Sequence, residues 1–130
     1  MDIKTRRPNH IEDVLVRLHG GQWFGWSDSK NKVYTNIILH EKLWDGTYEG
    51  SIHEEGLIDN PHSKPTQEFL ESELKKMQDA FDSKDYARKR ADEYPSLLEQ
   101  MDMQYHDAVD GTTTWQDAVQ AVKDAHPKPE

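Results

Sequence analysis

The sequence contains no cysteine, which excludes disulfide bonds, thiolate metal sites and cysteine nucleophiles. It also has no hydrophobic run long enough to cross a bilayer, and its first residues, MDIKTRRPNH, lack a signal-peptide core. We therefore predict a protein without membrane contact that is made in the cytosol. No Ser stands in a G-x-S-x-G context, and there is no glycine-rich phosphate loop. The sequence supports no enzyme activity, so we predict neither catalytic residues nor a cofactor.

Positive charge is scarce in the second half of the chain. No Lys or Arg occurs from Ala91 to Val122, and the whole chain carries a net charge of −9. Because such a surface repels phosphate groups, we predict no nucleic acid partner. The acidic character has three interpretations: simple solubility, a face for a basic partner, or a mimic of DNA.

Apolar residues are few, at 34%, against 32% charged residues, and the mean hydropathy is −1.01. Four Trp, five Tyr and three Phe nevertheless argue against a disordered chain, because these rings must be buried somewhere. At 130 residues the chain is most economically one folded unit. We predict an α+β fold in which residues 1–65 form a helix, a β-hairpin and a long loop, and residues 66–130 form a helical module.

The first predicted element is a short helix from Ile11 to His19. Its apolar residues recur at helical spacing, Asn9 is a plausible N-cap, and Gly20 and Gly21 end it.

A β-hairpin follows, because residues 22–28 and 32–40 are rich in aromatic and β-branched side chains and a turn-forming SKN separates them. A two-stranded hairpin is marginal alone, so we expect it to pack on a helix. Residues 41–65 are rich in Gly, Asp, Asn and Pro, which indicates a long loop; a third strand around residues 48–52 is the alternative.

After Pro65 we predict three helices. Thr66 is placed to cap the first, which must finish by Tyr94 because Pro95 disfavours a helical conformation there; a break near Asp82 and Ser83 is left open. Ser96 and Glu99 form a capping box for the second helix.

The second helix should end at Gly111, and Thr113 or Thr114 should cap the third, with Gln116 or Asp117 as the reciprocal partner. Pro127 and Pro129 forbid its continuation. The apolar stripes of the three helices give the predicted core: Leu70, Leu74, Met77, Phe81, Met101, Tyr105, Trp115 and Val119.

Seven histidines raise the question of a metal site, but no pair has the H-E-x-x-H spacing that brings two imidazoles to one helical face. Asp102 and His106 are four residues apart, which is typical of an exposed side-chain pair. We therefore predict no metal. The segments considered were His40-Glu41, His53-Glu54-Glu55, His62 and Tyr105-His106-Asp107.

Aromatic side chains outside the helices are the candidates for partner binding, because buried aromatic anchors dominate protein interfaces. These are Trp23, Trp26, Trp44 and Tyr48. The segment Gly20–Trp26 is aromatic enough to stack sugars or bases, but the pattern favours the interpretation that its rings form the core of the hairpin.

Longer motifs in the second half resemble a signature of small tailed-bacteriophage proteins. They are Lys64-Pro65-Thr66, then Tyr86 to Ser96 as Y-x-x-x-R-x-x-E-Y-P-S, then Leu97 to Asp107 as L-x-x-Q-M-D-M-x-Y-H-D, then Gly111 to Pro129 as G-T-x-x-W-x-x-A-V-x-x-V-K-x-x-H-P-K-P. The order of a short helix, a Trp-containing strand and Tyr34-Thr35-Asn36-Ile37 is also similar to the XkdW-like phage tail-region proteins. The resemblance does not cover residues 41–62, and Leu97 departs from the family's Y-P-S-(I/V)-x-x-Q pattern.

The resemblance implies a structural component of the phage virion, at the tail fibre or baseplate, that acts by binding neighbouring tail proteins. It implies no catalytic residue. An assembly chaperone for the tail fibre, absent from the mature virion, is the alternative, and an acidic inhibitor that mimics DNA is a further one. The sequence leaves open whether copies of the chain also associate with each other.

Overall fold

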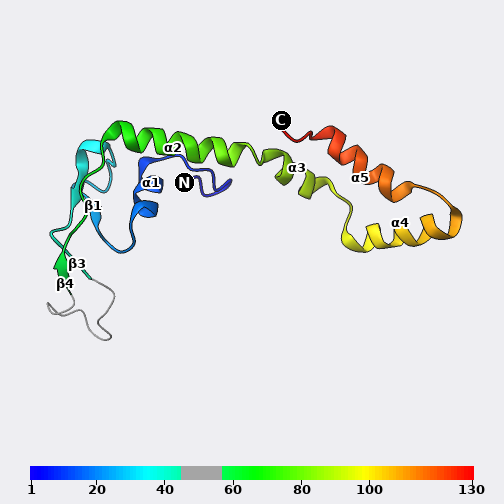
Figure 1. Cartoon of the computed structure of the whole chain (residues 1–130), viewed down its shortest axis with the longest axis horizontal. Coiled ribbons are helices and arrows are strands. Elements are labelled where there is room, and N and C mark those ends of the chain that lie inside the picture. Colours follow the sequence, from blue (N-terminus) through cyan, green and yellow to red (C-terminus); the bar gives the residue numbers. More distant parts are fainter. Residues whose placement is uncertain (45–56) are drawn as a thin grey trace. The chain divides into compact units, whose positions relative to one another are not determined.

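A computed structural model describes residues 1–44 and 57–130 of the chain (Figure 1). The chain divides into two units, Met1–Gln78 and Asp79–Glu130. The structure combines helices with two small antiparallel hairpins, so the predicted α+β fold class is confirmed. The division falls inside helix α2 (Gln67–Asp82), later than the change at residue 66 that composition suggested, because the first turns of α2 belong to the core of the first unit.

Helix α1 spans Ile11–Leu18, close to the predicted range. Its N-cap is His10 and not Asn9, because the His10 Nδ1 accepts a hydrogen bond from the backbone N–H of Glu12 at 3.0 Å. The carboxylate of Asp13 completes the cap by accepting from the backbone N–H groups of Asn9 and His10, at 3.0 and 3.1 Å. These contacts satisfy donors that a helix start would otherwise leave unpaired.

The predicted hairpin is present, with shorter strands. Strand β1 (Phe24–Trp26) pairs antiparallel with β2 (Ile37–Leu39), in the register Phe24 opposite Leu39 and Trp26 opposite Ile37. A single 3₁₀ turn at Tyr34–Asn36 replaces the first part of the expected second strand. The hydroxyl of Tyr34 donates to the carbonyl of Pro65 at 2.7 Å, which connects this turn to the chain just before α2.

A second hairpin lies where a long loop was the main expectation. Strand β3 (Lys42–Trp44) pairs antiparallel with β4 (Leu57–Asp59), and Lys42 forms an ion pair with Asp59 across it. The side chain of Asn60 donates to the carbonyls of Trp23 and His40, at 2.8 Å each, and so connects the two hairpins. The third strand expected around residues 48–52 falls outside the described residues.

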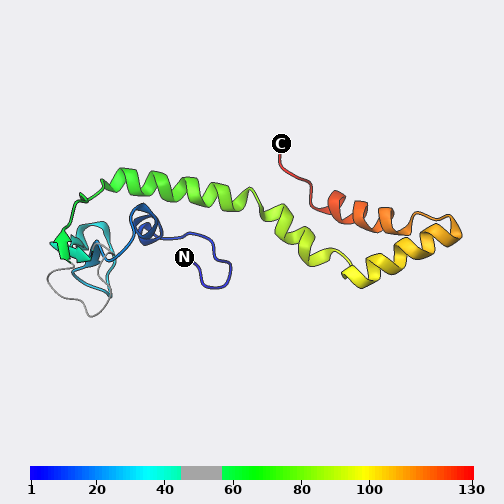
Figure 2. The same cartoon turned by 60° about the horizontal axis from the view of Figure 1, so that its bottom comes forward.

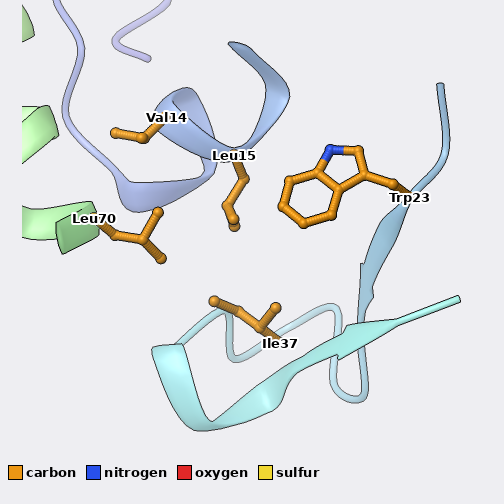
Figure 3. Packing of buried hydrophobic residues seen from close by; sticks show 5 residues of the cluster. All are labelled: Val14, Leu15, Trp23, Ile37 and Leu70. Atoms are coloured by element: carbon orange, nitrogen blue, oxygen red, sulfur yellow. The ribbon is translucent and has the colours of Figure 1, made fainter. Parts of the chain in front are cut away.

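The core of the first unit consists of five buried side chains (Figure 3). Helix α1 contributes two, β2 one, α2 one, and the fifth, Trp23, directly precedes β1, so segments more than fifty residues apart in sequence meet around one cluster. Figure 3 shows the five converging from these elements: Val14, Leu15, Trp23, Ile37 and Leu70. The expected packing of the hairpin against a helix is confirmed.

The second unit is helical, with α3 (Asp85–Glu93), α4 (Leu97–Asp110) and α5 (Thr114–Ala125) after the last turn of α2. The break left open near Asp82 is present, so four helices follow residue 66 in place of three. Helix α3 ends before Tyr94, which is extended, in agreement with the restriction that Pro95 imposes. Helices α4 and α5 run antiparallel and side by side in both views (Figures 1 and 2).

Three of the predicted helix boundaries are confirmed, two by hydrogen bonds and one by its backbone conformation. The hydroxyl of Thr66 accepts from the backbone N–H of Phe69 at 3.1 Å at the start of α2. Ser96 and Glu99 satisfy each other's backbone donors, at 3.1 and 3.2 Å, at the start of α4. Gly111 ends α4 with φ of 68°, a left-handed conformation that favours glycine.

Candidate binding surface

Four aromatic residues were predicted to anchor a partner. For Trp23 this prediction is wrong, because its side chain is fully buried. Its ring packs edge-on against His19 and Phe24, with centroids 4.9 and 5.1 Å apart. The hairpin is too small to be stable alone, and the buried ring of Trp23, directly before β1, attaches it to α1. The alternative interpretation, in which Trp23 belongs to the core of the hairpin, is confirmed.

Trp26 is half-buried, packed against the core cluster, with its ring 5.8 Å from that of His10. It is therefore not a freely exposed anchor either. The side chain of Trp44 and the whole of Tyr48 lie outside the described residues, so their predicted role stays a prediction.

The predicted core residues of α2 do pack. Leu70 is fully buried, and Leu74 and Met77 are partly buried against the core of the first unit. Phe81, in the second unit, is half-buried, and the guanidinium of Arg88 lies over its ring at 3.8 Å from the centroid.

The second unit departs from the prediction at α4. Trp115 and Val119 are half-buried, but Met101 and Tyr105, both expected in the core, expose 59% and 66% of their surface. The apolar stripe of α4 is therefore not directed at α5.

Polar contacts explain this rotation of α4. The side of the helix that is turned toward α5 carries Gln100, Met103 and Asp107, spaced three and four residues apart and less exposed than their neighbours. The Gln100 side chain accepts a hydrogen bond from the Trp115 indole N–H at 3.1 Å. The Asp107 carboxylate accepts one from the Trp115 backbone N–H at 2.8 Å. Because these bonds fix which side of α4 meets α5, the apolar side is left outward.

The exposed side of α4 carries four apolar residues, which we call the α4 stripe: Leu98, Met101, Tyr105 and Val109. Their spacing of three, four and four residues places them on one face over three helical turns. Their exposed fractions are 79%, 59%, 66% and 64%. Scattered single apolar residues are ordinary on a surface, whereas a continuous helical face of them indicates an interaction site.

A row of polar residues borders the α4 stripe. Each stripe residue is followed in sequence by a residue of this row, and successive residues of an α-helix lie about 100° apart around the axis. The row contains three carboxylates and one imidazole: Glu99, Asp102, His106 and Asp110. The His106 Nε2 lies 3.5 Å from an oxygen of Asp102, an exposed pair as the sequence predicted. One edge of the stripe is thus acidic.

The sequence did not identify Asp107 as a structural residue. Its carboxylate accepts hydrogen bonds from the hydroxyls of Thr112 and Thr114 at 2.6 Å each, and from the backbone N–H groups of Thr114 and Trp115. These bonds, led by the one from Thr112, hold the pKa of Asp107 far below its usual range. A carboxylate four residues before Gly111 and its run of threonines was the available signal.

The predicted cap of α5 is wrong, because Asp107 takes the place of the threonine side chain. Thr113 stands at the N-cap position but its side chain caps nothing, and its hydroxyl instead donates to Asp117 at 3.1 Å. The first N–H groups of α5 are satisfied by Asp107, so a residue in the last turn of α4 caps the next helix.

The second unit has no buried core. All of residues 79–130 are described, and none of their side chains is fully buried. Polar contacts connect the helices: the Arg90 guanidinium donates to the carbonyl of His126 at 2.8 Å, and the His126 Nε2 lies 2.8 Å from a carboxylate oxygen of Glu93. Helices this short gain most of their stability from burying an apolar face, and here the apolar face of α4 is exposed.

Helix α5 carries a depression of its own. A shallow depression of about 270 Å³ runs along α5, lined by Trp115, Val119 and Lys123 with two glutamines.

Within residues 1–44 and 57–130, no three His, Asp or Glu side chains gather in a way that would hold a metal ion. The segment His53-Glu54-Glu55 lies outside this range. None of the helices in the described ranges combines the length and the apolar character that crossing a bilayer requires.

The chain was compared with models of known protein families, with curated proteins and with solved structures, and none of the three comparisons found a match.

Proposed function

We propose that this chain acts by binding other proteins in the tail of a bacteriophage, as a virion component at the tail fibre or the baseplate. The observation that carries the binding role is the α4 stripe, four apolar side chains on one exposed helical face. The assignment to a phage tail rests on the motifs of the second half, from Tyr86 to Pro129, and on their resemblance to small tail-region proteins.

The structure gives these motifs a physical meaning that is consistent with a binding role. The YPS segment ends α3 and caps α4, and the G-T-x-x-W segment closes α4 onto α5 through Asp107. Both motifs therefore position α4, the helix that carries the exposed stripe. A motif that maintains the geometry of one exposed helix supports a role in binding more than a role in chemistry.

A tail-fibre assembly chaperone is the second candidate, and the absence of a buried side chain in residues 79–130 favours it. A unit that completes its burial only on a partner suits transient contact, because the free protein remains folded by local polar bonds. A DNA mimic is disfavoured, since the acidic row of α4 borders an apolar stripe and not a further acidic row.

Quantitative mass spectrometry of purified virions tests the proposal, with this chain counted against the major capsid protein. We expect a fixed whole-number copy count per particle. Absence from virions, together with abundance in lysates of infected cells, would contradict the structural role and leave the chaperone.

A further inference from the structure

The α4 stripe needs an occupant, and its charged surroundings restrict what that occupant can be. We propose that α4 docks a basic amphipathic helix of a partner protein, with apolar residues on the stripe and Lys or Arg beside the acidic row. This inference rests on the proposed binding function and adds the chemistry of the partner to it.

The shape of the site selects a helix. The stripe follows one face of a single α-helix of 14 residues, which is about 21 Å long. Residues at helical spacing leave grooves into which the side chains of a second helix fit. An extended strand would need unpaired backbone groups to bond with, and the backbone of α4 is already paired internally.

The charge of α4 disfavours a second copy as the occupant. Helix α4 carries four carboxylates and no Lys or Arg. The surrounding stretch from Ala91 to Val122 carries no basic residue either. Two copies packed through their stripes would bring these negative charges together, which costs free energy at low ionic strength. A basic helix instead gains from the same charges, both in its rate of association and in its selectivity.

The acidic row has the position that such a partner requires. Asp102 and Asp110 adjoin the stripe, with exposed side chains directed to solvent. In paired helices, residues beside the apolar seam form the interhelical charge contacts that select the partner. Glu99 is occupied by the cap of α4, so the partner is offered Asp110 and Asp102, whose exposed carboxylate lies 3.5 Å from His106.

Two synthetic helical peptides with the same leucine stripe, one flanked by lysines and the other by glutamates, test the inference on the full chain. Fluorescence anisotropy measures both affinities at low and at high salt. We expect the lysine peptide to bind at least about tenfold more tightly at low salt, and the difference to shrink as salt screens the charges. Equal affinities, or no binding of the lysine peptide, would overturn the inference.

Variants of the chain make the test specific to α4. The double variant Leu98→Gln/Met101→Gln should abolish binding, whereas Ile3→Gln, at an equally apolar and 94% exposed residue outside α4, should leave it unchanged. The variant Asp102→Lys/Asp110→Lys should reverse the preference and favour the glutamate peptide. Circular dichroism verifies that each variant keeps its helices.

Sedimentation equilibrium of the full chain covers the remaining occupant. We expect a monomer at low salt; a dimer that Leu98→Gln/Met101→Gln dissociates would overturn the inference and identify a second copy on the stripe. The copy count in virions is independent of these peptides. A fixed count with no preference for the lysine peptide would retain the tail role and reject only the basic helix.

Discussion

The two units of this chain are stabilised in different ways. The first, Met1–Gln78, surrounds five buried side chains from segments that are distant in sequence, including a fully buried Trp. The second, Asp79–Glu130, buries no side chain fully and is connected through caps and polar bonds between neighbouring helices. A unit with its own core holds a fixed shape, whereas a unit with an apolar face left outward has that face available for a partner.

The largest expected effect tests the core of the first unit. Replacing Trp23 by Ala removes a fully buried indole and should lower the free energy of unfolding by about 3–5 kcal/mol. The matched variant Trp115→Ala removes the same side chain from a half-buried position in the second unit, and a smaller loss of about 1 kcal/mol is expected there. Urea denaturation measures both. Equal losses would contradict the difference between the units.

A second prediction concerns the polar bonds that hold the second unit together. Replacing Asp107 by Ala removes the acceptor of four hydrogen bonds, so the start of α5 should fray and the hydrogen exchange of the Thr114 and Trp115 amides should accelerate. The control is Asp110→Ala, three residues later and exposed at the end of α4. Unchanged exchange in the Asp107 variant would show that α5 is held by packing alone.

A smaller effect is expected from pH in the first unit, where two histidines are in contact. The imidazoles of His19 and His62 are stacked with centroids 3.6 Å apart. Burial, and secondly the nearby His19, lower the pKa of His62 below its ordinary value of about 6.5. The unfolded chain then binds the proton more readily, so the stability that this site contributes is present above about pH 6.5 and is lost as the pH falls through the lowered pKa.

The measurement is the urea midpoint of the first unit from about pH 7 to about pH 5, a range that covers the ordinary pKa of histidine. The variant His62→Gln should flatten the pH dependence of this midpoint, whereas His106→Gln, on exposed α4, should leave it as it is. A slope that persists in His62→Gln would assign the effect to another group.

Local features of the fold could be predicted from the sequence because their causes are local. The capping box at Ser96 and the end of α3 before Pro95 depend on a few neighbouring residues, and both are confirmed. The break at the end of α2 has no Pro or Gly to mark it. The hairpin strands are three residues long, too short for alternation to distinguish their two faces, so the buried position of Trp23 was not determined by the pattern.

The candidate site was missed for a different reason. Helical periodicity identified Met101 and Tyr105 as members of an apolar face, correctly, but it does not say what covers that face. Which side of α4 meets α5 depends on Gln100 and Asp107, polar residues that both bond to Trp115, fifteen and eight positions later in the sequence. Periodicity therefore predicted that Met101 and Tyr105 share one apolar face, but it placed that face in the core.

The smallest expected loss of stability comes from changing the α4 stripe, and comparing it with a change in the core distinguishes the two units most directly. The variant Leu98→Gln/Met101→Gln replaces apolar side chains at two exposed positions of α4 with a residue of similar helix propensity, so stability should change by no more than about 0.5 kcal/mol per site. Leu15→Ala, in the core of the first unit, should cost about 2–5 kcal/mol in the same urea titration. A comparable loss from the α4 variant would mean that the stripe packs within the folded chain. A negligible loss would mean that the stripe is dispensable for folding, which is what a surface kept for a partner requires.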